Sequence, residues 1–116
     1  MNPNLIFRIA VREIESWVLA DRKAFALFLG IQHRLIPSRP DEIDNPKMKV
    51  IELANCSRKR YLREAIVPNE KGTARLGPDY NGQMTYFVKN FWNIHEAMKN
   101  SNSLKRTYDA INHIKF

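Results

Sequence analysis

The segment Leu5–Val11 constrains the fold more than any other part of this chain. It reads Leu-Ile-Phe-Arg-Ile-Ala-Val, a β-prone run in which both alternating faces are largely apolar. A strand covered on both sides is typical of a parallel sheet. No second convincing strand follows, so the sequence predicts a mainly α protein with one short N-terminal β-strand at residues 5–11. A single buried strand needs a neighbour.

From Arg12 onward, apolar residues recur at helical spacing, and we expect about five to seven helices after the strand. The first helix should end near Ala20, where Asp21 can cap the second helix. Gly30 stands where the second helix should end. Residues 31–46 contain three prolines and few apolar anchors, which predicts a surface connection.

A third helix is predicted to start at Asn45-Pro46, because asparagine is a good N-cap and proline suits the first helical position. Its apolar stripe begins with Met48 and continues, after a break near residues 56–57, as far as Pro68. Residues 68–82 hold three of the four glycines and show little periodicity. They predict a long loop, and loops of this kind are often functional.

The C-terminal third is predicted to be helical again. Asp79 or Asn81 can cap a helix that begins near Gly82. The apolar residues at 94, 97 and 98 either extend this helix or start a second one after residues 92–93. A serine at position 101 or 103 can cap the last helix. The length of 116 residues suits one hydrophobic core, so residues 1–116 are predicted to form a single domain.

Charge and cysteine content narrow the class of protein. A net charge of +7 makes anionic partners plausible, nucleic acid among them. No apolar stretch approaches the roughly 20 residues of a membrane-spanning helix, so no membrane partner is predicted. The N-terminus lacks the basic residues of a secretory signal, and the lone Cys56 suits a reducing compartment, so we expect a cytoplasmic protein. Cys56 itself is predicted to be a small buried thiol.

Two glutamates directly after the predicted strand are candidate metal ligands. Glu13 and Glu15 stand where ligands usually bind in an α/β layer. Their spacing places both on one face of a strand, but on a helix at most one would touch the ion. The alternative is that the two glutamates only stabilise the first turn of a helix through its dipole. Asp21 is likewise expected to be a cap rather than a ligand.

A basic run directly after the break near residues 56–57 is the candidate nucleic-acid contact. Four cations within six residues, followed by two more in the predicted loop, could grip phosphates. The alternative is a solvated helix face, and a single shared surface would favour nucleic acid. The predicted nucleic-acid-binding residues are Arg58, Lys59, Arg60, Arg63, Lys71 and Arg75.

Five stretches, in order, resemble a bacterial family of uncharacterised proteins related to the topoisomerase and primase (Toprim) domain. They are residues 10–21 (Ala-Val-Arg-Glu-Ile-Glu-Ser-Trp-Val-Leu-Ala-Asp), 45–47 (Asn-Pro-Lys), 77–81 (Gly-Pro-Asp-Tyr-Asn), 91–92 (Phe-Trp) and 101–104 (Ser-Asn-Ser-Leu). The resemblance implies the C-terminal part of an α/β Toprim-like fold. It is the context of nucleases associated with phage exclusion, in which acidic residues bind magnesium for phosphodiester chemistry.

The resemblance places Glu13 in the catalytic position and both Glu13 and Glu15 as ligands of Mg²⁺ or Mn²⁺. The remaining acidic residues of such a site would come from an N-terminal part, so we expect an accessory or truncated protein that is not catalytic alone. It would contribute to metal-dependent phosphodiester chemistry on nucleic acid in phage defence. Residues 5–11 would then need a homodimer or a partner chain to pair with. The alternative is a non-catalytic protein-interaction or nucleic-acid-binding module.

Overall fold

The computed structural model of this protein describes residues 14–114. Residues 14–20 are helical, and α2 (Arg22–Leu29), α3 (Pro46–Asn55), α4 (Arg60–Ile66), α5 (Tyr80–Asn90), α6 (Ile94–Met98) and α7 (Asn102–Asn112) follow. Two short 3-10 helices, η1 (His33–Leu35) and η2 (Pro40–Glu42), connect α2 to α3. No strand occurs between residues 14 and 114, and the predicted mainly helical character is confirmed there. The predicted strand at residues 5–11 lies outside the described residues.

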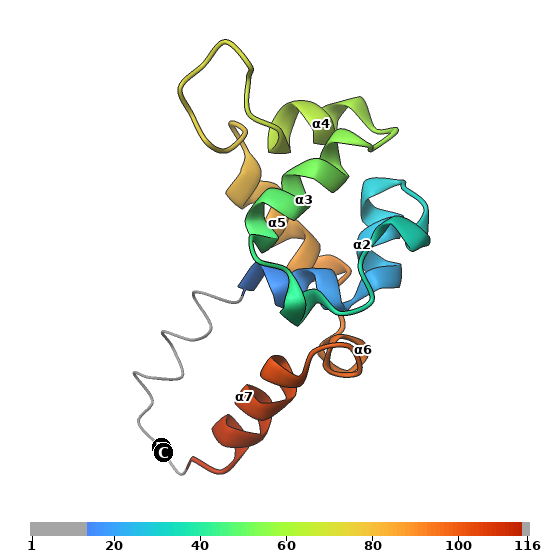
Figure 1. Cartoon of the computed structure of the whole chain (residues 1–116), viewed down its shortest axis with the longest axis vertical. Coiled ribbons are helices and arrows are strands. Elements are labelled where there is room, and N and C mark those ends of the chain that lie inside the picture. Colours follow the sequence, from blue (N-terminus) through green and yellow to red (C-terminus); the bar gives the residue numbers. More distant parts are fainter. Residues whose placement is uncertain (1–13, 115–116) are drawn as a thin grey trace.

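The main hydrophobic core lies between α2, α3, α4 and α5 (Figure 1). Phe25 of α2 and Phe87 of α5 are fully buried at its centre. Their ring centroids are 5.0 Å apart with an interplanar angle of 72°, the edge-to-face arrangement that aromatic pairs prefer. Val50 of α3 and Leu62 of α4 are also fully buried against them. The core therefore joins helices from both sides of the long loop between α4 and α5.

A second apolar cluster attaches α6 and α7 to the first helix. Trp17 packs there with Ala97 of α6 and Leu104 of α7. The indole nitrogen of Trp17 donates to Ser103 Oγ at 2.9 Å, and that of Trp92 donates to the Trp17 carbonyl at 2.8 Å. Because both indole N–H groups are paired, Trp17 can be buried and Trp92 partly buried without an unsatisfied donor.

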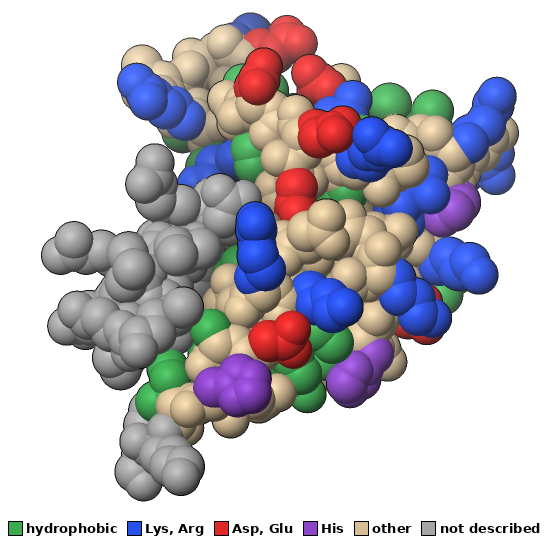
Figure 2. All heavy atoms as spheres, turned by 60° about the horizontal axis from the view of Figure 1, so that its bottom comes forward, with side chains coloured by type: hydrophobic (Ala, Val, Ile, Leu, Met, Phe, Trp, Pro, Cys, Tyr) green, Lys and Arg blue, Asp and Glu red, His purple; other side chains and the backbone are tan. Residues whose placement is uncertain are grey.

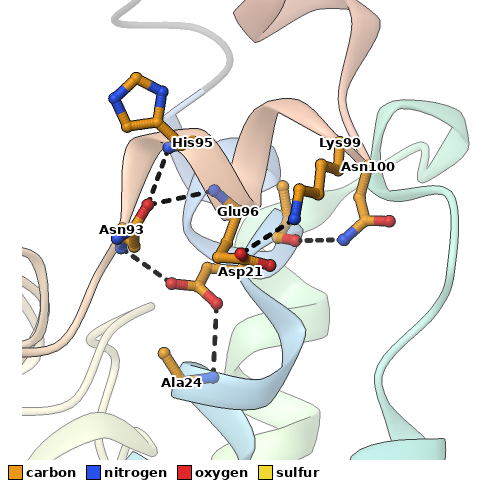
Figure 3. A network of polar contacts seen from close by, with 8 residues as sticks. Asp21, Ala24, Asn93, His95, Glu96, Lys99 and Asn100 are labelled. Atoms are coloured by element: carbon orange, nitrogen blue, oxygen red, sulfur yellow. Dashed lines mark hydrogen bonds and ion pairs between the residues drawn. The ribbon is translucent and has the colours of Figure 1, made fainter.

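Asp21 links the start of α2 to the start of α6, and Figure 3 shows the network around it. One carboxylate oxygen accepts from the Ala24 amide at 3.4 Å, and the other accepts from the Asn93 amide at 2.8 Å. The Asn93 side chain in turn caps α6 by accepting from the amides of His95 and Glu96. The predicted capping role of Asp21 is therefore confirmed.

Other helix ends also follow the local signals of the sequence. Gly30 ends α2 at φ +69°, in the left-handed region that glycine adopts without strain. The Asn45 side chain accepts from the Met48 amide at 3.1 Å, with Pro46 at the first position of α3. The predicted break near residues 56–57 is confirmed, since α3 ends at Asn55 and α4 begins at Arg60.

The connection at residues 31–46 is more firmly anchored than predicted. Ile36 and Pro40 are buried, and the Arg22 guanidinium donates to the Ile36 carbonyl at 2.7 Å. Asp41 accepts from Ser101 Oγ at 2.7 Å and from the Ser103 amide at 3.0 Å, which ties η2 to the start of α7. These partners lie far away in the sequence, so a local pattern could not indicate them.

The loop between α4 and α5 ends earlier than predicted. α5 begins at Tyr80 rather than near Gly82, and Asp79 is its N-cap residue. The Asp79 side chain makes no capping hydrogen bond and accepts instead from Gln83 Nε2 at 3.1 Å. The predicted capping bond is therefore wrong, and Asn81 lies inside the helix.

The end of this loop is fixed to the end of α4 through the backbone. The Gly77 amide donates to the Ile66 carbonyl at 3.0 Å, and the Asp79 amide donates to the Ala65 carbonyl at 2.9 Å. The last carbonyls of a helix have no intrahelical partner, so these two bonds satisfy groups that α4 leaves open. They also set where α5 can begin.

Candidate nucleic-acid interface

Hydrogen bonds join the C-terminal end of α2 to the turn between α3 and α4. Lys59 Nζ donates to the Phe28 carbonyl at 2.8 Å and to the Leu27 carbonyl at 3.4 Å. Ser57 is buried; its hydroxyl donates to the Leu29 carbonyl and accepts from the Lys59 amide at 3.0 Å. A cation at a helix C-terminus is favoured by the helix dipole, and here it comes from a distant turn.

A cleft of about 720 Å³ lies beside this junction. It is bordered by the end of α2, by η1, and by the turn between α3 and α4. The described residues that line it are Gly30, Ile31, Gln32, Arg34, Leu35, Cys56, Arg58 and Lys59. Three of these carry a positive charge and none is acidic. We call this hollow the basic cleft.

Two arginines of the basic cleft are available to an anion, whereas its lysine is not. Arg34 and Arg58 are exposed, and no salt bridge within residues 14–114 involves either of them. Arg34 Nε donates to Gln32 Oε1 at 2.5 Å, which leaves the terminal nitrogens of its guanidinium for an anion. Lys59 is already bound to the carbonyls at the end of α2. A guanidinium presents its donors in a planar fork that matches two phosphate oxygens, so the two arginines are the groups best suited to a phosphate.

The predicted basic residues do not all line the basic cleft. Arg60 pairs with Glu64 at 2.8 Å on α4, and Arg63 donates to the Ser57 carbonyl within the turn. Lys71 and Arg75 are exposed in the long loop that follows the C-terminal end of α4 (Figure 1), whereas the cleft residues Arg58 and Lys59 precede its N-terminal end. Only Arg58 and Lys59 of the predicted set line the cleft.

Arg34 completes the cleft and was not predicted from the sequence. It lies in η1, in the segment expected to be a plain surface connection. On the face drawn in Figure 2, cationic side chains are spread among Asp and Glu rather than gathered in one continuous field. A local cluster without acidic residues is therefore more informative than the net charge.

The prediction for Cys56 is wrong, because its thiol is exposed and lines the basic cleft. Cys56 is the C-cap residue of α3 and lies on the turn that Lys59 and Ser57 anchor. Cysteine is usually among the most buried residue types, but the position of Cys56 at the end of α3 exposes its thiol.

Glu15 is held away from the basic cleft. Its side chain is only 12% exposed; its Oε1 lies 3.7 Å from Lys47 Nζ and accepts from the Tyr80 hydroxyl at 3.3 Å. Burial, followed by the charge of Glu15 and this hydrogen bond, raises the pKa of Tyr80, so the phenol stays protonated as a donor. The contact ties the first helix to α5.

Glu15 lines a separate pocket of about 400 Å³, together with the apolar residues Ile14, Val18 and Met84. This pocket shares no described lining residue with the basic cleft. Within residues 14–114 no group of three or more His, Cys, Asp or Glu side chains could hold a metal ion. Glu13 lies outside those residues, so its catalytic role and the Mg²⁺ or Mn²⁺ site with Glu15 stay predictions.

Comparison of the chain with protein-family models, with curated proteins and with solved structures gave no match. The Toprim-related assignment therefore stays a prediction from the five sequence stretches. Among the described residues, no helix combines the length and the apolar character needed to cross a bilayer.

Proposed function

We propose that this protein binds nucleic acid without itself being a catalyst, and that the basic cleft is the contact with the phosphate backbone. The observation that carries the proposal is the meeting of Arg34, Arg58 and Lys59 at one hollow whose described lining contains no acidic side chain. Two separate segments of the chain converge there.

The three cations have different roles, and together these roles support binding of a phosphate backbone. Lys59 compensates the carbonyls at the end of α2, which would otherwise repel an anion. Arg34 and Arg58 then contribute charge that is not neutralised by a described acidic partner. Contacts of this kind displace counterions from the nucleic acid and make affinity fall with salt.

The Arg34→Gln/Arg58→Gln double variant tests the proposal. We expect its affinity for a 15-nucleotide oligonucleotide in low salt to be about tenfold weaker than that of the unaltered protein. The slope of log affinity against log salt concentration should be shallower by the amount expected for the loss of about two phosphate contacts. Fluorescence anisotropy over a range of salt concentrations measures both quantities. The fold should be retained, because both side chains are exposed.

The matched control is the Lys71→Gln/Arg75→Gln variant, which removes the same charge from the loop beyond α4. At about 0.15 M salt it should bind within about twofold of the unaltered protein, because exposed charges more than about 8 Å from the contact are then largely screened. If both double variants weaken binding equally, only the net charge matters and the assignment to the basic cleft is wrong.

The accessory role in phosphodiester chemistry is a further step that rests on the sequence resemblance. A non-catalytic nucleic-acid contact is consistent with that role, since a partner chain would then supply the remaining acidic residues. The function proposed for this chain needs no metal.

A further inference from the structure

We propose that the nucleic acid bound here is single-stranded, and that its bases stack on Tyr86 and Phe91 while its phosphates lie in the basic cleft. This inference rests on the proposed function and adds the class of nucleic acid that the protein prefers. Its basis is an exposed aromatic pair that shares a buried neighbour with the basic cleft.

Phe28 of α2 joins the two features. Its carbonyl accepts from Lys59 Nζ at 2.8 Å, on the side of the basic cleft. Its buried ring lies 6.4 Å from the ring of Tyr86 and 5.6 Å from that of Phe91, measured between centroids. One residue therefore separates a cation of the cleft from two aromatic rings of α5 and its C-terminal end.

Both rings of the aromatic pair are exposed to solvent. Tyr86 is 53% exposed and Phe91 is 38% exposed, and their centroids are 6.0 Å apart. Leu27, whose carbonyl also accepts from Lys59, is 70% exposed on the same end of α2. The core does not need the two exposed rings, because Phe25, Phe28 and Phe87 already supply its aromatic side chains. We call Tyr86 and Phe91 the aromatic patch.

Single-stranded nucleic acid fits both features at once. Its phosphates need cations, and its unpaired bases offer flat faces that stack on exposed aromatic rings with little regard to sequence. A duplex hides those faces between neighbouring base pairs, so it could use the basic cleft but not the aromatic patch. A protein partner would use the patch without drawing on the arginines of the cleft.

The test compares three probes of equal length: single-stranded oligothymidylate, a duplex, and an oligonucleotide whose central nucleotides are abasic. Tyr86→Leu keeps an apolar side chain but removes the ring, whereas Tyr86→Phe keeps the ring. We expect Tyr86→Leu to weaken binding of oligothymidylate about tenfold but to change the affinity for the abasic probe by less than about twofold. Tyr86→Phe should bind oligothymidylate with the affinity of the unaltered protein. Thermal unfolding of each variant shows that the fold is intact.

The outcomes separate this inference from the proposed function. If the unaltered protein binds the duplex and the abasic probe as tightly as oligothymidylate, and Tyr86→Leu changes nothing, stacking is wrong while the cleft assignment stands. If Arg34→Gln/Arg58→Gln fails to weaken any probe, the proposed function is wrong. If Tyr86→Leu abolishes self-association in sedimentation experiments and leaves oligonucleotide affinity unchanged, the aromatic patch belongs to a second copy and the inference is overturned.

Discussion

Replacing Gly77 with alanine is expected to destabilise the protein by about 3 kcal/mol, at the upper end of the range typical of overpacked sites. A Cβ atom at this position would lie 2.3 Å from the Ala65 carbonyl oxygen and 2.4 Å from the Ile66 carbonyl carbon. Both are backbone atoms at the end of α4, so neither can rotate away. Relief requires the loop to move, and that breaks the bonds that fix the start of α5.

Gly72→Ala in the same loop is the matched control. Its added Cβ would meet nothing closer than the Asn69 carbonyl oxygen at 3.5 Å, an ordinary contact. Urea unfolding should place this variant within about 0.5 kcal/mol of the unaltered protein. Equal stability of the Gly77→Ala and Gly72→Ala variants would show that the loop does not close on α4 as described.

Replacing Asp21 with alanine is expected to lower the free energy of unfolding by about 2 to 3 kcal/mol. The change removes the cap of α2, which costs about 1 kcal/mol, and also deprives the Asn93 amide of its acceptor. Asp21 is only 4% exposed, so water does not readily replace the carboxylate. The loss should also loosen α6, which the same network positions (Figure 3).

Asn45→Ala provides the comparison for a cap with one partner. Asn45 is exposed and accepts only from the Met48 amide among the described residues, so its loss should cost about 1 kcal/mol. Urea unfolding measures both variants. If Asp21→Ala costs no more than Asn45→Ala, the bridge from α2 to α6 adds nothing to stability.

Helix ends were the most predictable part of the fold, because their signals are local. Asp21, Gly30 and Asn45 each act within one helical turn, so the residue type and its place beside an apolar stripe suffice. The start of α5 was missed because it depends on Gly77 and Asp79 bonding to α4. The predicted stripe of α3 was also partly wrong, since Met48 is exposed.

The candidate site was predictable only where it is contiguous. Arg58 and Lys59 belong to a dense basic run that a sequence pattern detects. Arg34 comes from another segment, and the closure of α2 onto the α3–α4 turn brings it to the basic cleft. The same closure gives Lys59 its structural role, which charge density alone cannot indicate. Tertiary contacts thus separate the cations of this run that bond to backbone carbonyls, Lys59 and Arg63, from the exposed Arg58.

The single cysteine offers the most direct test of the central claim, because Cys56 lines the basic cleft. Labelling of this thiol by a bulky maleimide should become at least fivefold slower when the protein is saturated with a single-stranded oligonucleotide. A thiol placed in the distant loop, in a Cys56→Ser/Thr73→Cys variant, should be labelled at the same rate with and without the oligonucleotide. Unchanged labelling of Cys56 in a complex shown by anisotropy to be fully formed would contradict binding at the basic cleft.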